Sequence, residues 1–277
     1  MTDSIKAVIL DWAGTVVDFG SRAPMGAFVR AFAEFGVAIE VADARGPMGM
    51  AKWDHIHAVG TSPRVAAAWR ARHGRDFASA DADAIFAVFE PMNAASVVEH
   101  AGFVPGALAA LAVLRGRGIR FGSTTGYTRP IMRRLLPVAA AAGYEPEVVV
   151  CAGDLPAGRP SPLMMWYAMA RMGVWPADRV VKVDDTPVGI GEGVAAGTWT
   201  VGLALTGNIS GLSEAELTAL PSPEVAAIRA RATAEMAAAG ADLTIDSIAD
   251  LPDAVAEIER RAAAGGRPGG AASRPRA

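Results

Sequence analysis

The segment AVILDWAGTV, residues 7–16, carries the clearest indication of the fold. Residues 7–10 are continuously apolar, which is typical of a short strand buried on both faces. The apolar run stops at Asp11, and the turn-forming pair Ala13-Gly14 follows shortly after it. We therefore expect a buried strand that delivers Asp11 to its carboxyl end.

Short apolar segments alternate with alanine-rich segments of helical period from residue 101 onward. The expected strands are 118–125, 147–150, 180–185 and 198–203, and the expected helices are 107–117, 129–142, 162–172 and 188–196. This alternation predicts an α/β fold: a Rossmann-like core in which helices cover both faces of a parallel sheet and the crossovers are right-handed.

Polar side chains end several of these expected strands. In open parallel sheets the functional site lies beyond the carboxyl ends of the strands, so residues at those ends are expected to converge. They are Asp11, Thr125, Asp184 and Asp185.

A long segment separates the first two expected strands. Helical spacing at residues 25–36, 63–73 and 83–98 predicts an inserted α-helical cap domain over residues 20–100. Residues 1–19 and 101–262 then form the core domain, and the glycines of the linkers Phe19-Gly20 and Ala101-Gly102 can act as hinges. Residues 263–277, rich in Ala, Gly, Pro and Arg, are predicted to form a disordered tail.

The composition limits the classes of partner. A net charge of -3 with scattered basic residues gives no footprint for nucleic acid. The single cysteine, Cys151, excludes an internal disulfide, and no apolar run reaches the roughly 18 residues of a membrane helix. The N-terminal residues do not resemble a signal peptide. We expect a cytoplasmic protein that acts on a small molecule, without a nucleic-acid or membrane partner.

The residues after the first strand resemble a known motif. Asp11-Trp12-Ala13-Gly14-Thr15 is similar to the first motif of the haloacid dehalogenase superfamily, Asp-x-Asp-x-Thr/Val. The resemblance implies that Asp11 is a nucleophile toward phosphorus and a ligand of Mg²⁺. Taken alone, an aspartate that ends a buried strand can also be only a turn residue or a helix cap.

Three further segments resemble the remaining motifs of that superfamily, in the same order. Ser123-Thr124-Thr125-Gly126 is similar to the second motif, which implies that Thr125 and Gly126 bind phosphate. Arg159 stands where the third motif has its cation, and Asp184-Asp185 matches the metal carboxylates of the fourth. Each segment alone could be an ordinary turn, surface or capping sequence, but four matches in order at strand ends identify the superfamily.

Position 13 departs from the pattern of the phosphatases in this superfamily. They carry a second aspartate there as a general acid and base, whereas this chain has Ala13, which cannot transfer a proton. The chain resembles the phosphonoacetaldehyde hydrolase family over residues 5 to about 260. The specific signature is Ala13 in combination with Met48-Gly49, Lys52 and His55 of the expected cap. A lysine at this place can otherwise be a solvated cap residue.

That resemblance implies an activity. Lys52 condenses with the aldehyde of phosphonoacetaldehyde, and the resulting imine accepts the electrons released when the carbon–phosphorus bond breaks. Asp11 takes the phosphoryl group, and water then releases phosphate, which would support the degradation of 2-aminoethylphosphonate. Because the reacting amine must be neutral, burial or nearby positive charge is expected to lower the pKa of Lys52.

The resemblance also implies roles for the surrounding residues. Ala13 offers its backbone carbonyl to Mg²⁺, and Asp185 completes the protein ligands. Met48, His55 and Tyr127 are implied to line the substrate pocket. His55 is also implied to carry a proton near Lys52. Met48 and His55 can also be ordinary residues of the cap core.

Three expectations are less direct. Some relatives have an aspartate where this chain has Gly189, and we infer that Asp184 partly replaces it. The family also implies a homodimer through the cap domains. The alternatives are a phosphomonoesterase or phosphomutase of the same superfamily, which Ala13 disfavours, and an inactive binding protein that keeps the fold, which the intact motifs disfavour.

Overall fold

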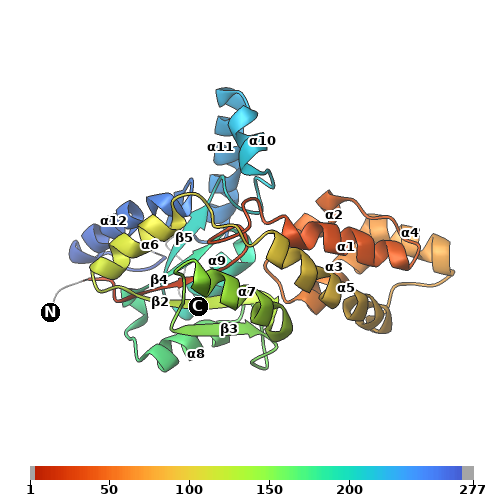
Figure 1. The fold of residues 1–277 in the computed structure, drawn as a ribbon, viewed down its shortest axis with the longest axis horizontal. Coiled ribbons are helices and arrows are strands. Elements are labelled where there is room, and N and C mark those ends of the chain that lie inside the picture. Colours follow the sequence, from red (N-terminus) through yellow and green to blue (C-terminus); the bar gives the residue numbers. More distant parts are fainter. Residues whose placement is uncertain (1–3, 270–277) are drawn as a thin grey trace.

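The computed structural model describes residues 4–269. Two parts lie side by side along the long axis of the molecule: an α/β core and a group of helices inserted into it (Figure 1). None of the helices within residues 4–269 has the length and apolarity needed to cross a bilayer.

The core is built on a parallel sheet. Its strand order is β3-β2-β1-β4-β5-β6, and all of its pairings are parallel. The strands are β1 (Ala7–Leu10), β2 (Arg120–Thr128), β3 (Val148–Ala152), β4 (Val180–Asp184), β5 (Trp199–Leu203) and β6 (Leu243–Ile245). This order confirms the predicted α/β fold and puts β1 and β4 in the centre.

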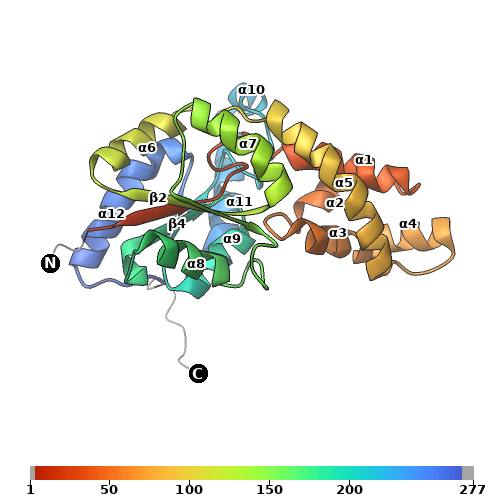
Figure 2. The same ribbon diagram turned by 60° about the horizontal axis from the view of Figure 1, so that its bottom comes forward.

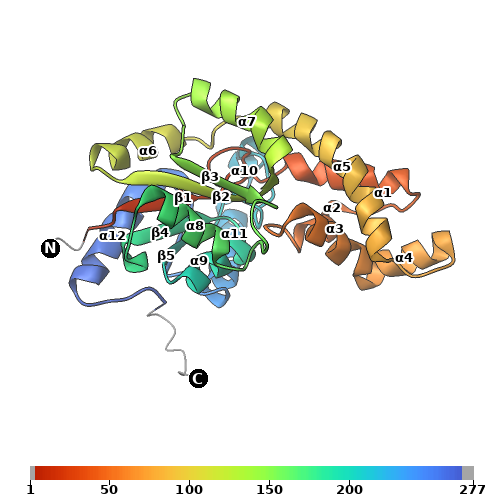
Figure 3. The ribbon, with the colours of Figure 1, turned by 90° about the horizontal axis from the view of Figure 1, so that it is seen from below.

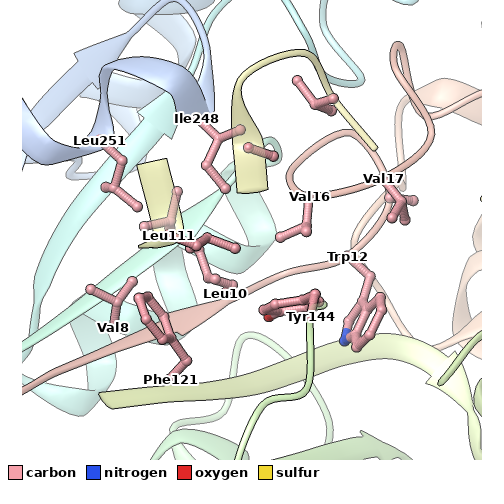
Figure 4. Packing of buried hydrophobic residues seen from close by; sticks show 14 of the residues in the cluster. Val8, Leu10, Trp12, Val16, Val17, Leu111, Phe121, Tyr144, Ile248 and Leu251 are labelled. Atoms are coloured by element: carbon pink, nitrogen blue, oxygen red, sulfur yellow. The ribbon is translucent and has the colours of Figure 1, made fainter. Parts of the chain in front are cut away.

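The central strand β1 is apolar throughout because both of its faces are covered. Val8 and Leu10 belong to one hydrophobic cluster, whereas Ala7 and Ile9 belong to another on the opposite face. In the first cluster Val8 and Leu10 pack against Phe121 and Leu111, and Trp12 lies beyond the strand end (Figure 4). A strand of this composition is therefore anchored rigidly just before Asp11.

Helices cover both faces of the sheet (Figure 3). One face is covered by α6 (Ala107–Gly116), α7 (Arg129–Ala141) and α12 (Leu251–Ala263), and the other by α8 (Leu163–Met172), α9 (Pro187–Ala196) and α11 (Ser222–Ala238). The short helix α10 (Glu214–Ala219) precedes α11, and single 3₁₀ turns lie at Ala177–Arg179 and Ile248–Asp250.

The insertion between β1 and α6 has helices as its regular elements, as predicted. It contains α1 (Ala23–Glu34), α2 (Val41–Arg45), α3 (Lys52–Thr61), α4 (Pro63–His73) and α5 (Ser79–Glu99). These helices share a hydrophobic cluster of their own, in which Phe28 stacks on Phe89 with ring centroids 4.3 Å apart. The insertion packs on the core mainly where α5 meets α7, on one side of the sheet (Figure 2).

Some elements were not predicted. Helices α2 and α3 of the insertion lack a clear apolar period, and α3 mixes polar, aromatic and glycine residues. After residue 203 the structure adds β6 and helices α10, α11 and α12. The three residues of β6 are only half-buried, so the sequence carries little strand signal there. The boundaries at residues 20 and 100 stay a prediction.

The predicted tail begins within the described residues. The backbone N–H of Gly269 donates to Asp242 Oδ1 at 2.7 Å, and Arg267 pairs with Asp178, so the chain still contacts the core beyond α12. The rest of the predicted tail, residues 270–277, lies outside the described part of the chain.

Candidate active site

Residues from the sheet edge and the insertion enclose one small cavity of about 20 Å³. Nine of the predicted site residues line it: Asp11, Ala13, Met48, Lys52, Thr125, Gly126, Tyr127, Arg159 and Asp185. Ser21, Pro24, Gly49 and Thr186 complete the wall. The sheet thus supplies the carboxylates and Arg159, and the insertion supplies Met48 and Lys52.

Glycines let the two parts approach closely. A Cβ on Gly126 would lie 2.8 Å from the backbone oxygen of Met50, and one on Gly49 would lie 2.4 Å from Thr186 Oγ1. Both positions therefore require glycine for the insertion to close on the sheet. On the core side, Gly14 has a positive φ of 77°, and a Cβ there would overlap Asp185 Oδ2.

Arg159 is the best-connected side chain of the site. Its guanidinium lies 2.8 Å from Asp11 Oδ1, 3.2 Å from Asp184 Oδ2 and 3.0 Å from Glu192 Oε2. It also donates to the backbone oxygen of Thr124 at 2.6 Å. Burial opposes its charge, but these carboxylates outweigh that effect and raise the pKa of Arg159 above its usual range. The side chain is a fixed cation.

Lys182 and Glu192 were missed by the sequence analysis. Both are fully buried, and Lys182 Nζ lies 3.0 Å from Asp184 Oδ2 and 3.2 Å from Glu192 Oε2. Thr124 Oγ1 accepts from Lys182 Nζ and donates to Glu192 Oε2, each at 2.8 Å. The available signal was a charged residue in the middle of an apolar strand or helix. A charge that is buried in such an element requires a partner.

Three carboxylates crowd together beside this network. Asp11, Asp184 and Asp185 each place a ligand oxygen within 4.8 Å of the others. Burial and the charge of Asp184 raise the pKa of Asp11 to about 6, and burial with the charges of Asp11 and Asp184 raises the pKa of Asp185 well above its usual value.

Asp184 behaves differently from its two neighbours. Burial would raise its pKa, but the charges of Arg159 and Lys182 hold it below the usual value. A Cβ at Gly189 would lie 2.0 Å from Asp184 Cγ, so the Asp184 carboxylate fills the space that a side chain at residue 189 would need. Asp184 does not line the cavity, which makes it a support for the two cations as well as a member of the carboxylate cluster.

The carboxylate cluster fits a hard divalent cation. Its donors are all oxygen atoms, as Mg²⁺ prefers. The buried group holds four carboxylates, including Glu192, against three basic side chains, Arg159, Lys182 and Lys52, so the carboxylates outnumber the cations. The raised pKa values of Asp11 and Asp185 express this excess. A divalent ion between them would remove it.

Lys52 is placed very differently from Arg159. It is the first residue of α3 and is 3% exposed. Its Nζ lies 3.6 Å from Met48 Sδ, 5.7 Å from the ring centre of Phe28 and 5.3 Å from that of Tyr127. Burial and the charge of Arg159 lower its pKa to about 8, although the carboxylate of Asp11 opposes the shift.

The predicted contacts His55 and Tyr127 are both buried. The ring of His55 packs against that of Phe28 at a tilt of 34°, with centroids 4.1 Å apart, and its Nε2 lies 2.6 Å from the backbone oxygen of Ala44. That carbonyl can only accept, so Nε2 carries the hydrogen and Nδ1 keeps its lone pair. Burial and the charge of Lys52 lower the pKa of His55 well below its usual value. His55 does not line the cavity, whereas Tyr127 does.

Known proteins resemble the chain in sequence. A family model of haloacid dehalogenase-like hydrolases matches residues 5–197. The phosphonoacetaldehyde hydrolase of Paraburkholderia phytofirmans is 51% identical over 264 residues, which cover 95% of this chain and 99% of that protein. The phosphonoacetaldehyde hydrolase of Klebsiella pneumoniae is 46% identical, with 95% and 99% covered.

Solved structures resemble the fold. A phosphonoacetaldehyde hydrolase-like protein from Oleispira antarctica superposes with a TM-score of 0.93 at 38% identity, covering 95% of this chain and 96% of that one. A putative beta-phosphoglucomutase from Bacteroides vulgatus gives a TM-score of 0.65 at 19% identity, over 94% of this chain and 91% of that one, which shows a shared fold alone.

Proposed function

The chain belongs to the phosphonoacetaldehyde hydrolase family of the haloacid dehalogenase-like hydrolases, and from this premise we propose that it hydrolyses phosphonoacetaldehyde to acetaldehyde and phosphate. The observation that carries the proposal is the single cavity lined by both Asp11 and Lys52. A carboxylate nucleophile and an amine of lowered pKa face the same enclosed space, which is what cleavage of a carbon–phosphorus bond next to an aldehyde requires.

Lys52 forms the imine that accepts the electrons of the broken carbon–phosphorus bond. Its neutral amine adds to the aldehyde carbon, water leaves, and one proton is taken up from solvent, which gives a protonated imine. Only the neutral amine can add, and a pKa of about 8 leaves a substantial neutral fraction near neutral pH. The apolar surroundings of Met48, Phe28 and Tyr127 favour that neutral form.

Asp11 receives the phosphoryl group. Its carboxylate oxygen bonds to phosphorus while the carbon–phosphorus bond breaks, and the bond electrons move through carbon to the imine nitrogen as an enamine. Arg159 would balance the phosphoryl charge, and Thr125 and Gly126, in the adjoining wall of the cavity, would contact its oxygens. Mg²⁺ held by Asp11, Asp185 and the Ala13 carbonyl would screen the charge on the transferring group.

The remaining steps return the enzyme to its starting state. Water attacks the aspartyl phosphate and releases phosphate, the enamine takes a proton at carbon, and a second water releases acetaldehyde from Lys52. Within residues 4–269, Nδ1 of His55 has no hydrogen-bond partner and is therefore free to accept a proton, but the lowered pKa makes it a weak base while Lys52 is charged. Ala13 is compatible with this route because an enamine, unlike an alkoxide, needs no acid at position 13.

The direct test compares products. With Mg²⁺ present, the native protein should release acetaldehyde and phosphate in equal amounts from phosphonoacetaldehyde, and Lys52→Ala should release neither. Turnover of ordinary sugar phosphates that survives Lys52→Ala would instead support a phosphomonoesterase or phosphomutase. A folded native protein that releases no phosphate from either substrate would support an inactive binding protein.

Assembly and location rest on the family alone. Membership supports a homodimer through the inserted helices, a core of residues 1–19 and 101–262 and a cytoplasmic site of action. Light scattering of the purified protein tests the dimer, because a mass near 28.5 kDa instead of twice that value would exclude it.

A further inference from the structure

The closed cavity raises the question of how the insertion is held in place. A volume of about 20 Å³ has room for a water molecule and no room for a phosphonate substrate. Movement of the insertion away from the sheet would make room for the substrate. Contacts that break and reform in this motion can report closure to the catalytic residues.

Arg45, at the end of α2, makes the most extensive polar contact between the two parts. Its guanidinium donates to the backbone oxygens of Gly20 at 3.3 Å, Asn208 at 3.1 Å and Gly211 at 3.0 Å, and to Asn208 Oδ1 at 3.2 Å. Asn208 Nδ2 returns a bond to the backbone oxygen of Arg45 at 3.3 Å. A Cβ at Gly211 would lie 2.6 Å from Arg45 Cζ, so the loop is shaped to the guanidinium.

The same loop holds a carboxylate of the active site. The backbone N–H of Asn208 donates to Asp185 Oδ2 at 2.7 Å. Just before it, a Cβ at Gly207 would lie 2.2 Å from Asp185 Cβ, so the loop backbone presses directly on this side chain. A shift of residues 207–208 cannot leave the Asp185 carboxylate where it is.

We propose that Arg45 is a positioning residue: by gripping the loop around Asn208 when the insertion closes, it sets the Asp185 carboxylate in the orientation that binds the divalent cation. The inference rests on the proposed function, and it deepens it by coupling entry of substrate to the order of the metal site. Arg45 touches neither the cavity nor the carboxylate cluster, and it acts through Asn208.

If Arg45 acted only through its charge, its removal would change the affinity for Mg²⁺ in the opposite direction. A positive charge near the cluster repels Mg²⁺, so removing it would tighten binding of the ion. Loss of positioning weakens binding, by about 10- to 100-fold when a group that orients a metal ligand is removed. The direction of the change separates the two roles.

The test is calorimetric titration of the metal-free full-length protein with Mg²⁺ alone. Arg45→Met should raise the dissociation constant by about 10- to 100-fold. Arg45→Lys should also weaken binding, since one ammonium keeps the charge but cannot span Gly20, Asn208 and Gly211 together. Arg64→Met is the matched control: Arg64 pairs on the surface of the same insertion with Asp43, and its loss should change binding less than about twofold.

The variant Asn208→Ala tests whether Arg45 acts on Asp185 through Asn208. If Arg45 acts through Asn208, the double variant with Arg45→Met should lose less affinity than the product of the two single losses, whereas Asn208→Ala with Arg64→Met should give the product. Unchanged or tighter Mg²⁺ binding in folded Arg45→Met and Arg45→Lys overturns the proposal, as does independence of Arg45 and Asn208. These titrations use no substrate, so a failure of the proposed activity would appear separately, as a native protein that releases no acetaldehyde.

Discussion

Two basic side chains that line the cavity, Arg159 and Lys52, are both buried, but their pKa values are shifted in opposite directions. Arg159, on the sheet side, contacts the carboxylates of Asp11, Asp184 and Glu192, and its pKa is raised. Lys52, on the insertion side, has a thioether and two aromatic rings as close neighbours, and its pKa falls to about 8. Burial disfavours charge in both, so the partners decide the outcome.

This difference assigns separate chemistry to the two parts of the molecule. The sheet keeps a permanent positive charge where a phosphoryl group would develop negative charge. The insertion keeps an amine that can lose its proton and attack a carbonyl. Neither part can perform the proposed reaction alone. Closing of the insertion would therefore bring the two reacting groups together as well as exclude water.

The largest expected loss of activity comes from replacing Lys52 by an arginine, the residue type found on the sheet side of the cavity. Lys52→Arg keeps a long cationic side chain but removes the amine that forms the imine. Acetaldehyde release should fall by more than about 1,000-fold, the scale seen when a covalent catalytic group is lost. A melting temperature close to native would show that the fold is intact, and more than a tenth of native turnover in such a protein would contradict the role of Lys52.

Asp11→Asn tests the same division from the sheet side. Phosphate release should fall by more than about 1,000-fold because the amide cannot accept the phosphoryl group. The Lys52 imine should still form, since it precedes phosphoryl transfer, and mass spectrometry after borohydride reduction checks this. A folded Asp11→Asn protein that forms no imine would show that the two steps are not separable.

Lys182→Met is expected to act on stability. It leaves Asp184 and Glu192 short of one buried counter-charge, and breaking a buried ion pair in this way costs about 3–5 kcal/mol of the free energy of unfolding. Urea denaturation measures the change. The matched control is Lys6→Met at an exposed lysine, for which a change within about 0.5 kcal/mol is expected. Equal effects for the two variants would mean that the buried network contributes little.

The pH dependence of Lys52 is the smallest and most graded effect. Because its pKa is lowered to about 8, the neutral fraction should rise about tenfold per pH unit below 8 and level off above it. An ordinary lysine would continue to gain reactivity to about pH 10.4. Labelling with an amine-specific reagent, quantified on the peptide that contains Lys52, measures the profile. A midpoint near 10 would place Lys52 in water instead of the apolar pocket.

The sequence predicted the features that depend on local pattern. The apolar run of β1 and its end at Asp11, the alternation of strands and helices and the helical insertion all follow from residue spacing, and motif resemblance supplied Thr125, Arg159 and Asp185. The strands, the helices and the helical insertion were predicted correctly because burial along each element follows a regular pattern. The roles of Thr125, Arg159 and Asp185 stay predictions, although all three line the same cavity.

The remaining features depend on partners far apart in the chain. Lys182 and Glu192 are supported by Arg159 and Thr124, and Arg45 is placed by Asn208, 163 residues away. No local period encodes such pairs, although a lysine in the middle of the apolar strand β4 was a usable signal. The half-buried strand β6 was missed because it lacks alternation.

The central claim is that an uncharged Lys52 amine bonds to the substrate aldehyde opposite Asp11. Borohydride reduction of the native protein during turnover of phosphonoacetaldehyde, followed by peptide mass mapping, tests it most directly. We expect a stable adduct on the peptide that contains Lys52 and loss of activity in proportion to labelling. Continued acetaldehyde release with no adduct on Lys52, or an adduct on another lysine, would contradict it.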